Sequence, residues 1–343
     1  MNILFHSNHI TERGTEIALF DYALGNVNIL KNNSFIASPK SGLSNVDVLE
    51  KFKQNFKVCL YETHEELIDF IKANGISLIY KIVHGGCKEG DIAEGIPHFI
   101  HCVFSTNNRY GTFYCGISEY LNFWFRTKYP SLPHIVKKFS GSTCSLHSVL
   151  NIPKDALVYG GYGGENNFSI VFAQAAVIET AAKNPNIHFI FLNFKPFTRN
   201  GEDFPNIHFL PKNVDRDYKE KFINTCDAMI HARKDGEIFS LAIAEFSVKN
   251  KPVITFAPNI KDNFFICVKQ FIKFIIKMTP TYYKGHLFYL GNKAIKYSTS
   301  KKLIDIFVNF KSKYLKDINY DCYSEEYSEE KVMRIFGEII KDK

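Results

Sequence analysis

The chain has 343 residues, which is too long for one typical hydrophobic core and suits two domains. Hydrophobic residues make up 45% and charged residues 22%, the composition of a globular protein, and no apolar stretch reaches the length of a membrane span. The net charge of +7 favours an anionic small molecule or a membrane surface as a partner. No lysine and arginine cluster interleaved with aromatics is present, which argues against nucleic acid.

Eight cysteines are scattered along the chain without a Cys-x-x-Cys pair, and several lie in apolar runs such as KVCLYE and FIHCVF. Buried free thiols in a reducing compartment explain this pattern better than disulfides or zinc. The first residues, MNILFHSNH, show neither a basic region nor a small-residue cleavage site, so they predict a strand and no signal peptide. We therefore expect an intracellular, cytoplasmic protein.

Short apolar runs alternate with helical patterns in the first half of the chain. The pattern predicts strands over 2–7, 34–38, 57–62, 76–83 and 98–104. It predicts one helix from about Thr15 to Leu24 and another that begins after Thr63, where Glu66 completes a capping box. Because the strands read as buried and β-branched, an open parallel sheet with helices on both faces is expected.

A stretch with two prolines and a glycine, over 127–145, interrupts this rhythm, which restarts near residue 152. A helix is then predicted from about Asn167 to Lys183, with strands over 156–164, 187–194, 207–211, 228–232 and 252–256. The order predicts an α/β fold of two Rossmann-like domains, an N-terminal one over 1–145 and a C-terminal one over 146–322. The acidic start of 323–343 predicts a helix that crosses back onto the N-terminal domain.

Two carboxylates, Glu237 and Glu245, stand eight residues apart in the otherwise apolar stretch HARKDGEIFSLAIAEF. A helix beginning near Phe239 would present free amides at its N-terminus, which is a ready site for an anion. Glu237 beside that terminus can accept hydrogen bonds from sugar hydroxyls, and Glu245, about two turns along, can reach a diol such as a ribose. The alternative is one acid that complements the helix dipole and a second on a solvent face. The predicted anion-binding amides are those of Ile238, Phe239, Ser240 and Leu241.

The segment CDAMIHARKDGEIFSLAIAEFSVKNKPVITF, residues 226–256, resembles the E-x7-E region of GT-B glycosyltransferases of the GT4 type. RGTEIALFDYA near the N-terminus and PHIV before the interdomain stretch also look like members of that family. The order of elements resembles the family over nearly the whole chain. One departure is Ser240, which stands where the family has its second glycine. The resemblance implies a retaining transferase that uses a nucleotide-diphosphate sugar as co-substrate, without a metal or other cofactor.

Carried over by position, Glu237 would contact the donor sugar, Glu245 the ribose hydroxyls, and the amides after Glu237 the diphosphate. Gly14, in the loop after the first strand, would let the backbone approach the donor phosphate and the acceptor closely. His101 matches the family's histidine at a strand end facing the cleft, with a core or sheet-edge histidine as the alternative. His84, which two glycines follow, is a second candidate that a simple turn would explain equally well.

The glycine-rich stretch YGGYGGENN departs from the family at one functional position. The family's loop supplies an arginine, and soon after it a lysine, to neutralise the leaving diphosphate. Here Gly161 stands at the arginine's place, and no basic residue occurs over 155–182. A leaving diphosphate needs cationic or dipolar stabilisation as its charge develops. The candidates to supply it are Lys195, Arg233, Lys234 or the helix N-terminus alone.

Two further patterns favour structural explanations. Asp215-x-Asp217 is the metal-binding pattern of a different transferase fold, but its position ahead of a lysine-rich helix start favours a helix cap. The scattered histidines lack metal-ligand spacing, so no metal site is predicted. The helical stretch 264–278 places Lys269, Lys273 and Lys277 four residues apart, which favours a solvated stripe on a packed helix over peripheral membrane contact.

Together the patterns favour a GT-B glycosyltransferase with a nucleotide-sugar donor, bound mainly by the second domain, and a glycan or glycoconjugate acceptor, bound by the first. Two alternatives stay open. One is a nucleotide-sugar-binding protein of the same fold with weak or no catalysis, for which the missing arginine is the evidence. The other is a nucleotide-sugar epimerase.

Overall fold

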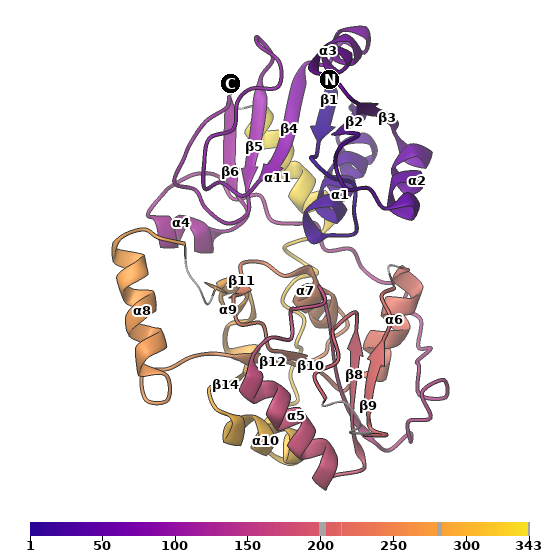
Figure 1. Cartoon of the computed structure of the whole chain (residues 1–343), viewed down its shortest axis with the longest axis vertical. Coiled ribbons are helices and arrows are strands. Elements are labelled where there is room, and N and C mark those ends of the chain that lie inside the picture. The colour runs from indigo at the N-terminus through magenta and orange to yellow at the C-terminus, as the bar shows by residue number, and fades with distance from the viewer. Residues whose placement is uncertain (199–203, 214, 280–282, 342–343) are drawn as a thin grey trace. The chain divides into compact units, whose positions relative to one another are not determined.

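The computed structural model describes residues 1–198, 204–213, 215–279 and 283–341. The chain forms two compact units, the first made of Met1–Ile135 with Glu326–Lys343 and the second of Val136–Glu325. Each unit contains one six-stranded sheet in which all neighbouring strands are parallel (Figure 1). The predicted α/β fold with two Rossmann-like domains is therefore confirmed.

The sheet of the first unit has the strand order β3-β2-β1-β4-β5-β6. Its strands are β1 (Asn2–His6), β2 (Asn33–Pro39), β3 (Lys57–Tyr61), β4 (Leu78–Val83), β5 (His98–Cys102) and β6 (Phe113–Gly116). Its helices are α1 (Gly14–Asn28), α2 (Val46–Asn55), α3 (His64–Ala73), α4 (Glu119–Phe125) and α11 (Glu329–Lys341). Thr63 caps α3 as predicted, because its hydroxyl accepts the amide of Glu66 at 3.3 Å.

The C-terminal helix α11 is part of the core of the first unit (Figure 1). Its buried residues Val332, Met333, Phe336 and Ile339 recur at helical spacing and so form one apolar face. The ring of Phe336 packs against those of Phe5, Tyr80 and Phe99, with centroids 6.5, 5.6 and 5.1 Å away. The predicted return of this helix to the N-terminal domain is confirmed, and residues 342–343 lie outside the described part.

The sheet of the second unit has the strand order β14-β12-β10-β7-β8-β9. Its strands are β7 (Leu157–Tyr162), β8 (Ile187–Leu192), β9 (Ile207–Leu210), β10 (Ala228–His231), β12 (Val253–Phe256) and β14 (Ile295–Tyr297), and a separate pair is formed by β11 (Gly236–Glu237) and β13 (Tyr283–Lys284). Its α-helices are α5 (Val171–Lys183), α6 (Arg216–Thr225), α7 (Leu241–Val248), α8 (Phe264–Ile275), α9 (Gly285–Leu290) and α10 (Ser300–Val308). Two short helical turns, η1 (Gly291–Lys293) and η2 (Phe310–Tyr314), complete it.

The units divide at Ile135, earlier than the sequence boundary at 145. The reason is a set of contacts that fix the connecting segment to the second unit. Ser140 donates to one carboxylate oxygen of Glu220 at 2.5 Å, and the amide of Gly141 donates to the other at 3.0 Å. Lys249 completes the cluster with an ion pair to Glu220 at 2.9 Å. Because Glu220 is 1% exposed, these partners satisfy a buried charge.

Candidate functional site

In the sheet of the second unit, β7 and β10 are neighbours, and the later strands continue outward from them on opposite sides: β8 and β9 beyond β7, and β12 and β14 beyond β10. In open parallel sheets, ligands bind beyond the carboxyl ends of the strands at such a switch point. The segment after β10 holds Arg233, Lys234 and Glu237, and Lys195 follows β8 on the other side of β7. The fold therefore places the predicted donor-site residues along the edge where a ligand is expected.

Glu237 and Arg233 form an ion pair in the loop after β10. The Arg233 Nη1 donates to Glu237 Oε1 at 2.9 Å, and the two side chains are 27% and 18% exposed. Gly236 shapes the loop with a φ of 71°, which favours glycine, and its amide donates to the Arg233 carbonyl at 3.1 Å. Burial raises the pKa of Glu237, although the neighbouring guanidinium acts in the opposite direction. The site thus holds a carboxylate and a guanidinium side by side.

The helix after Glu237 begins later than predicted, at Leu241 instead of near Phe239. Ser240 is its N-cap, and the Ser240 hydroxyl accepts the amide of Ile243 at 3.4 Å. Ile238 and Phe239 precede the helix and are only 4% and 3% exposed. Their amides therefore do not belong to the helix N-terminus. Of the predicted amides, that of Leu241 belongs to it.

Ser240 has φ 61° and ψ 100°, a backbone conformation that glycine adopts more easily than serine. This observation supports the resemblance on which Ser240 takes the place of a glycine. The backbone keeps the glycine-like conformation even though the residue has changed.

Glu245 is enclosed by two partners distant in sequence, and its side chain is 14% exposed. The Tyr162 hydroxyl at the end of β7 donates to Glu245 Oε2, and the Arg216 guanidinium lies 3.7 Å from Oε1. The Tyr162 ring also stacks on Phe246 with centroids 5.9 Å apart. The alternative of an acid on a solvent face is therefore wrong for Glu245, while its contact with a ribose stays a prediction. Sequence reasoning missed both partners.

A chain of buried polar groups leads from β10 to the backbone of Glu237. His231 Nδ1 is hydrogen-bonded to the Thr255 hydroxyl at 2.9 Å, and Thr255 to His286 Nε2 at 2.9 Å. His286 Nδ1 lies 3.4 Å from the Glu237 carbonyl oxygen. Burial lowers the pKa of His231 well below 6.5 and that of His286 to about 4, so both rings are neutral at pH 7. These groups hold the Glu237 loop and were not predicted from the sequence.

Gly161, where the family's arginine was expected, cannot carry a side chain without rearrangement. It lies within β7, and a Cβ built on it would be 2.7 Å from the carbonyl oxygen of Ile230 in β10. An arginine is therefore excluded there by strand packing. Of the proposed substitutes, Lys195 and Lys234 are exposed, and Arg233 is the one that contacts Glu237.

In the first unit the switch point lies between β1 and β4. Gly14 begins α1 at the end of the loop after β1, and a Cβ built on it meets nothing within 4 Å, which leaves open space at this position. His84 follows β4, is exposed, and stacks on Phe104 with centroids 5.1 Å apart. The glycine after it, Gly85, has a φ of 86° and its Cβ position lies 1.9 Å from the Ser105 carbonyl oxygen, so its backbone conformation and the close approach of the Ser105 backbone explain that glycine.

His101 lies in the core, contrary to the expectation of a strand end facing a cleft. It is 0% exposed, and its Nδ1 is hydrogen-bonded to the Tyr80 hydroxyl at 2.7 Å. Tyr22 and His134 flank the ring, with centroids 5.6 and 6.1 Å away. Burial lowers the pKa of His101 well below 6.5, with a smaller effect of His134 in the same direction. The structure thus matches the core alternative, and the geometry gives no support to a catalytic role.

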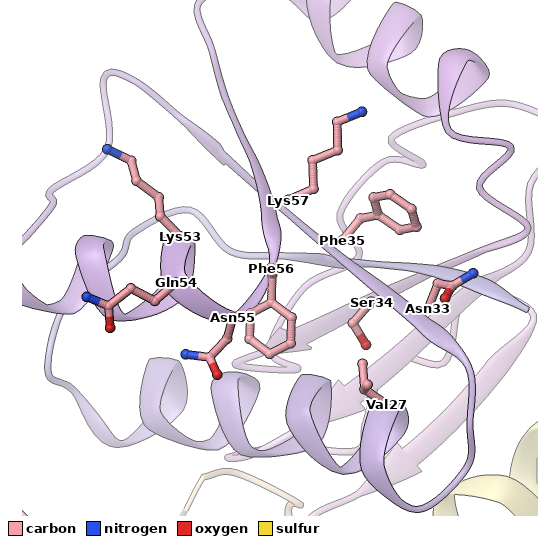
Figure 2. A pocket seen from close by; sticks show the side chains of 9 residues that line it. All are labelled: Val27, Asn33, Ser34, Phe35, Lys53, Gln54, Asn55, Phe56 and Lys57. Atoms are coloured by element: carbon pink, nitrogen blue, oxygen red, sulfur yellow. The ribbon is translucent and has the colours of Figure 1, made fainter.

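Two hollows lie at the amino ends of strands, opposite to the carboxyl ends where the predicted site residues lie. One, of about 460 Å³, is lined by nine residues at the amino ends of β2 and β3 and on neighbouring α1 and α2 (Figure 2). The other, of about 890 Å³, includes His188 and His208 near the starts of β8 and β9. Because ligands of this sheet type bind at the carboxyl ends, we do not assign the predicted site to either hollow.

Asp215 is a helix cap, as predicted, because its carboxylate accepts the amide of Tyr218 at 2.6 Å. Within the described ranges, no group of three or more His, Cys, Asp or Glu side chains is arranged to hold a metal ion. All eight cysteines are free; Cys102, Cys115 and Cys226 are buried as predicted, whereas Cys87 and Cys144 are exposed.

The lysine-bearing helix α8 is packed less closely than predicted: none of its residues is fully buried, although Ile266 packs against the core of the second unit. None of the helices that the structure describes combines the length and apolarity needed to cross a bilayer.

No protein-family model and no curated protein matches the sequence. Solved structures do resemble the fold. HepE from Anabaena, in complex with UDP and glucose, is 14% identical over 100% of both chains, with a TM-score of 0.69. A glycosyltransferase from Rickettsia africae is 11% identical over 100% of this chain and 99% of its own, with a TM-score of 0.64. A UDP-GlcNAc 2-epimerase from Neisseria meningitidis, bound to UDP-GlcNAc, is 10% identical over 100% of both chains, with a TM-score of 0.60. The chain therefore has the two-domain α/β fold of GT-B glycosyltransferases.

Proposed function

We propose that the chain is a retaining, metal-independent glycosyltransferase that moves a sugar from a nucleotide-diphosphate sugar to a hydroxyl of a glycan or glycoconjugate. The observation that carries the proposal is the Arg233–Glu237 pair, placed at the switch point of the second unit directly before the N-terminus of α7. The fold shared with the UDP-bound HepE supports the choice of donor class. A carboxylate there suits sugar hydroxyls, and a guanidinium suits a diphosphate.

In the proposed reaction, the bond between the anomeric carbon and the diphosphate oxygen breaks while the acceptor oxygen bonds to that carbon on the same face. The acceptor proton passes to the leaving phosphate oxygen. Arg233 and the α7 amides of Leu241 and Ala242 stabilise the negative charge on the leaving group. Glu237 orients the donor sugar through its hydroxyls. Because Oε1 accepts from Arg233, Oε2 is the oxygen assigned to the sugar.

The proposal is tested by a thermal-shift screen with UDP, GDP, dTDP and their sugars. A ligand at 100 times its Kd stabilises the native state by about 2.7 kcal/mol, which raises the Tm of a domain of this size by roughly 5–10 °C. No shift with any of these ligands would contradict the proposal.

The position of the diphosphate is tested with Arg233→Gln. Loss of a hydrogen bond to a charged group should weaken nucleotide-diphosphate binding roughly ten- to hundredfold and leave nucleoside binding nearly unchanged. Lys154→Gln is the matched control, because Lys154 is exposed and precedes the amino end of β7. Equal effects of Arg233→Gln on both ligands would place its charge away from the phosphates.

The likeness to a UDP-GlcNAc 2-epimerase makes product analysis necessary. Acceptor-dependent release of the nucleotide diphosphate supports transfer. An epimerised nucleotide sugar formed without acceptor would replace the proposal with an isomerase. Tight binding without either product would indicate a protein that has lost catalysis.

A further inference from the structure

The helix α8 lies at the margin of the second unit (Figure 1). Ile266 packs against the core, and Cys267, Gln270 and Phe274 are half-buried. At 3.6 residues per turn these four residues fall on one side of the helix. The remaining apolar residues of α8 therefore belong to a different face.

That outer face is continuous and apolar. Six exposed side chains fall within one arc of about 120° around the helix axis. Their exposed fractions range from 40% to 85%, and they are Phe264, Phe265, Val268, Phe271, Ile272 and Ile275. Three phenylalanines on one exposed arc are unusual for a surface that meets only water, because contiguous apolar patches generally mark a contact site.

The surroundings of this arc are strongly basic. Lys269 and Lys273 lie outside this arc on the helix, and Lys277 follows the end of the helix. Between Asp262 and Asp305 the sequence contains eight lysines and no Asp or Glu, while the net charge of the whole chain is only +7. Burial lowers the pKa of Lys273, and the charge of Lys269 acts in the same direction, so a negative partner would relieve a repulsion that is already present.

We propose that α8 docks on the surface of a bilayer that contains anionic lipids. The helix lies in the plane of the interface, with the arc from Phe264 to Ile275 inserted among the acyl chains and the lysines at the level of the phosphates. With 12 residues it is about 18 Å long, too short for a hydrocarbon core of about 30 Å, so it lies along the surface. An apolar face opposed to a lysine-rich one is the pattern of interfacial helices.

A second copy of the chain is a poorer occupant of this face. A symmetric contact would place the lysine-rich segments of both copies beside each other, with no acid in the segment to neutralise them. Anionic headgroups supply the missing charge. The inference stands independently of the proposed transferase activity, because it depends on α8 alone.

The test is co-sedimentation of the whole protein with vesicles of phosphatidylcholine alone and of phosphatidylcholine mixed with phosphatidylglycerol. Binding to the mixed vesicles is expected, decreasing with salt. Phe265→Ser and Phe271→Ser should each weaken it roughly ten- to hundredfold, because each ring leaves water on docking. Replacing Lys269, Lys273 and Lys277 together by Gln should weaken it roughly a hundredfold.

The matched control is Phe123→Ser in α4, where the phenylalanine is 62% exposed but lies in the first unit. It should leave vesicle binding unchanged. Unaltered circular dichroism and Tm in all variants separate lost docking from lost folding. Three results would overturn the inference: no binding to mixed vesicles, equal binding to neutral ones, or a dimer in sedimentation analysis that Phe265→Ser converts to a monomer.

Discussion

Replacing Gly161 by alanine tests whether strand packing, and not loss of function, explains why β7 carries no arginine at this position. The added Cβ would lie 2.7 Å from the Ile230 carbonyl oxygen and 3.4 Å from the Phe194 ring. Neither strand of the β7–β10 pair can yield easily, because both are central in the sheet. The strands must separate by several tenths of an ångström, and overpacking of this kind costs about 1–3 kcal/mol. For a domain of this size the Tm should fall by roughly 2–12 °C.

The assay is thermal and urea unfolding of the whole chain beside a matched control in the loop that follows β7. A Cβ at Gly164 has its nearest contact at 3.5 Å, with the side chain of Asn167, so Gly164→Ala should change the free energy of unfolding by about 0.5 kcal/mol or less. Gly161→Arg should be destabilised further and gain no nucleotide affinity. If Gly161→Ala and Gly164→Ala were equally stable, or Gly161→Arg bound nucleotide more tightly, the packing argument would be refuted.

Three further predictions concern charge. The pKa of Glu220 is lowered from 4.5 to about 2, because hydrogen bonds from Ser140 and Lys249 outweigh the effect of burial. Roughly 3 kcal/mol of stability that is present above pH 4.5 should therefore be lost as the pH falls to about 2. Urea unfolding of Glu220→Gln at a series of pH values should not show this loss. In calorimetry, Glu245→Ala should weaken the binding of free nucleotide and of nucleotide sugar alike, roughly ten- to hundredfold. Glu237→Ala should leave the binding of free nucleotide unchanged and lower turnover. Indistinguishable binding profiles of the two variants would reject these roles. Turnover should survive EDTA, and complete loss restored by Mn²⁺ would show that a metal takes part.

The sequence was sufficient for the architecture because buried parallel strands have a local pattern. It was insufficient for β6 and for β14, of which β14 has only three residues and is too short to show a period. The start of α7 at Leu241 does have a sequence signal, because serine is a preferred N-cap residue and Ser240 occupies that position. The domain boundary was misplaced because a polar, proline-containing segment looks like a linker, although Ser140 in fact binds Glu220.

Glu237 and Glu245 illustrate what a local sequence pattern cannot predict. Their spacing singled out Glu237 and Glu245, but the spacing carries no information on Tyr162 and Arg216, which meet Glu245 through the packing of β7 and α6 against α7. The same holds for His101, whose position in a short apolar strand suits a strand end and a core position equally well. Only the surrounding aromatic rings decide between the two.

The cation that the glycine-rich loop lacks also has to be sought in three dimensions. Strand packing excludes position 161, so the family's loop arginine has no direct equivalent there. The edge of the sheet instead carries guanidinium groups from two other elements, Arg233 after β10 and Arg216 at the start of α6, and each contacts one of the two acids. On the proposed function, a diphosphate would compete with Glu237 for Arg233, and a ribose would compete with Tyr162 for Glu245. The proposal therefore treats the acids and their partners as a preorganised set of contacts that a donor would replace without leaving a buried charge unpaired.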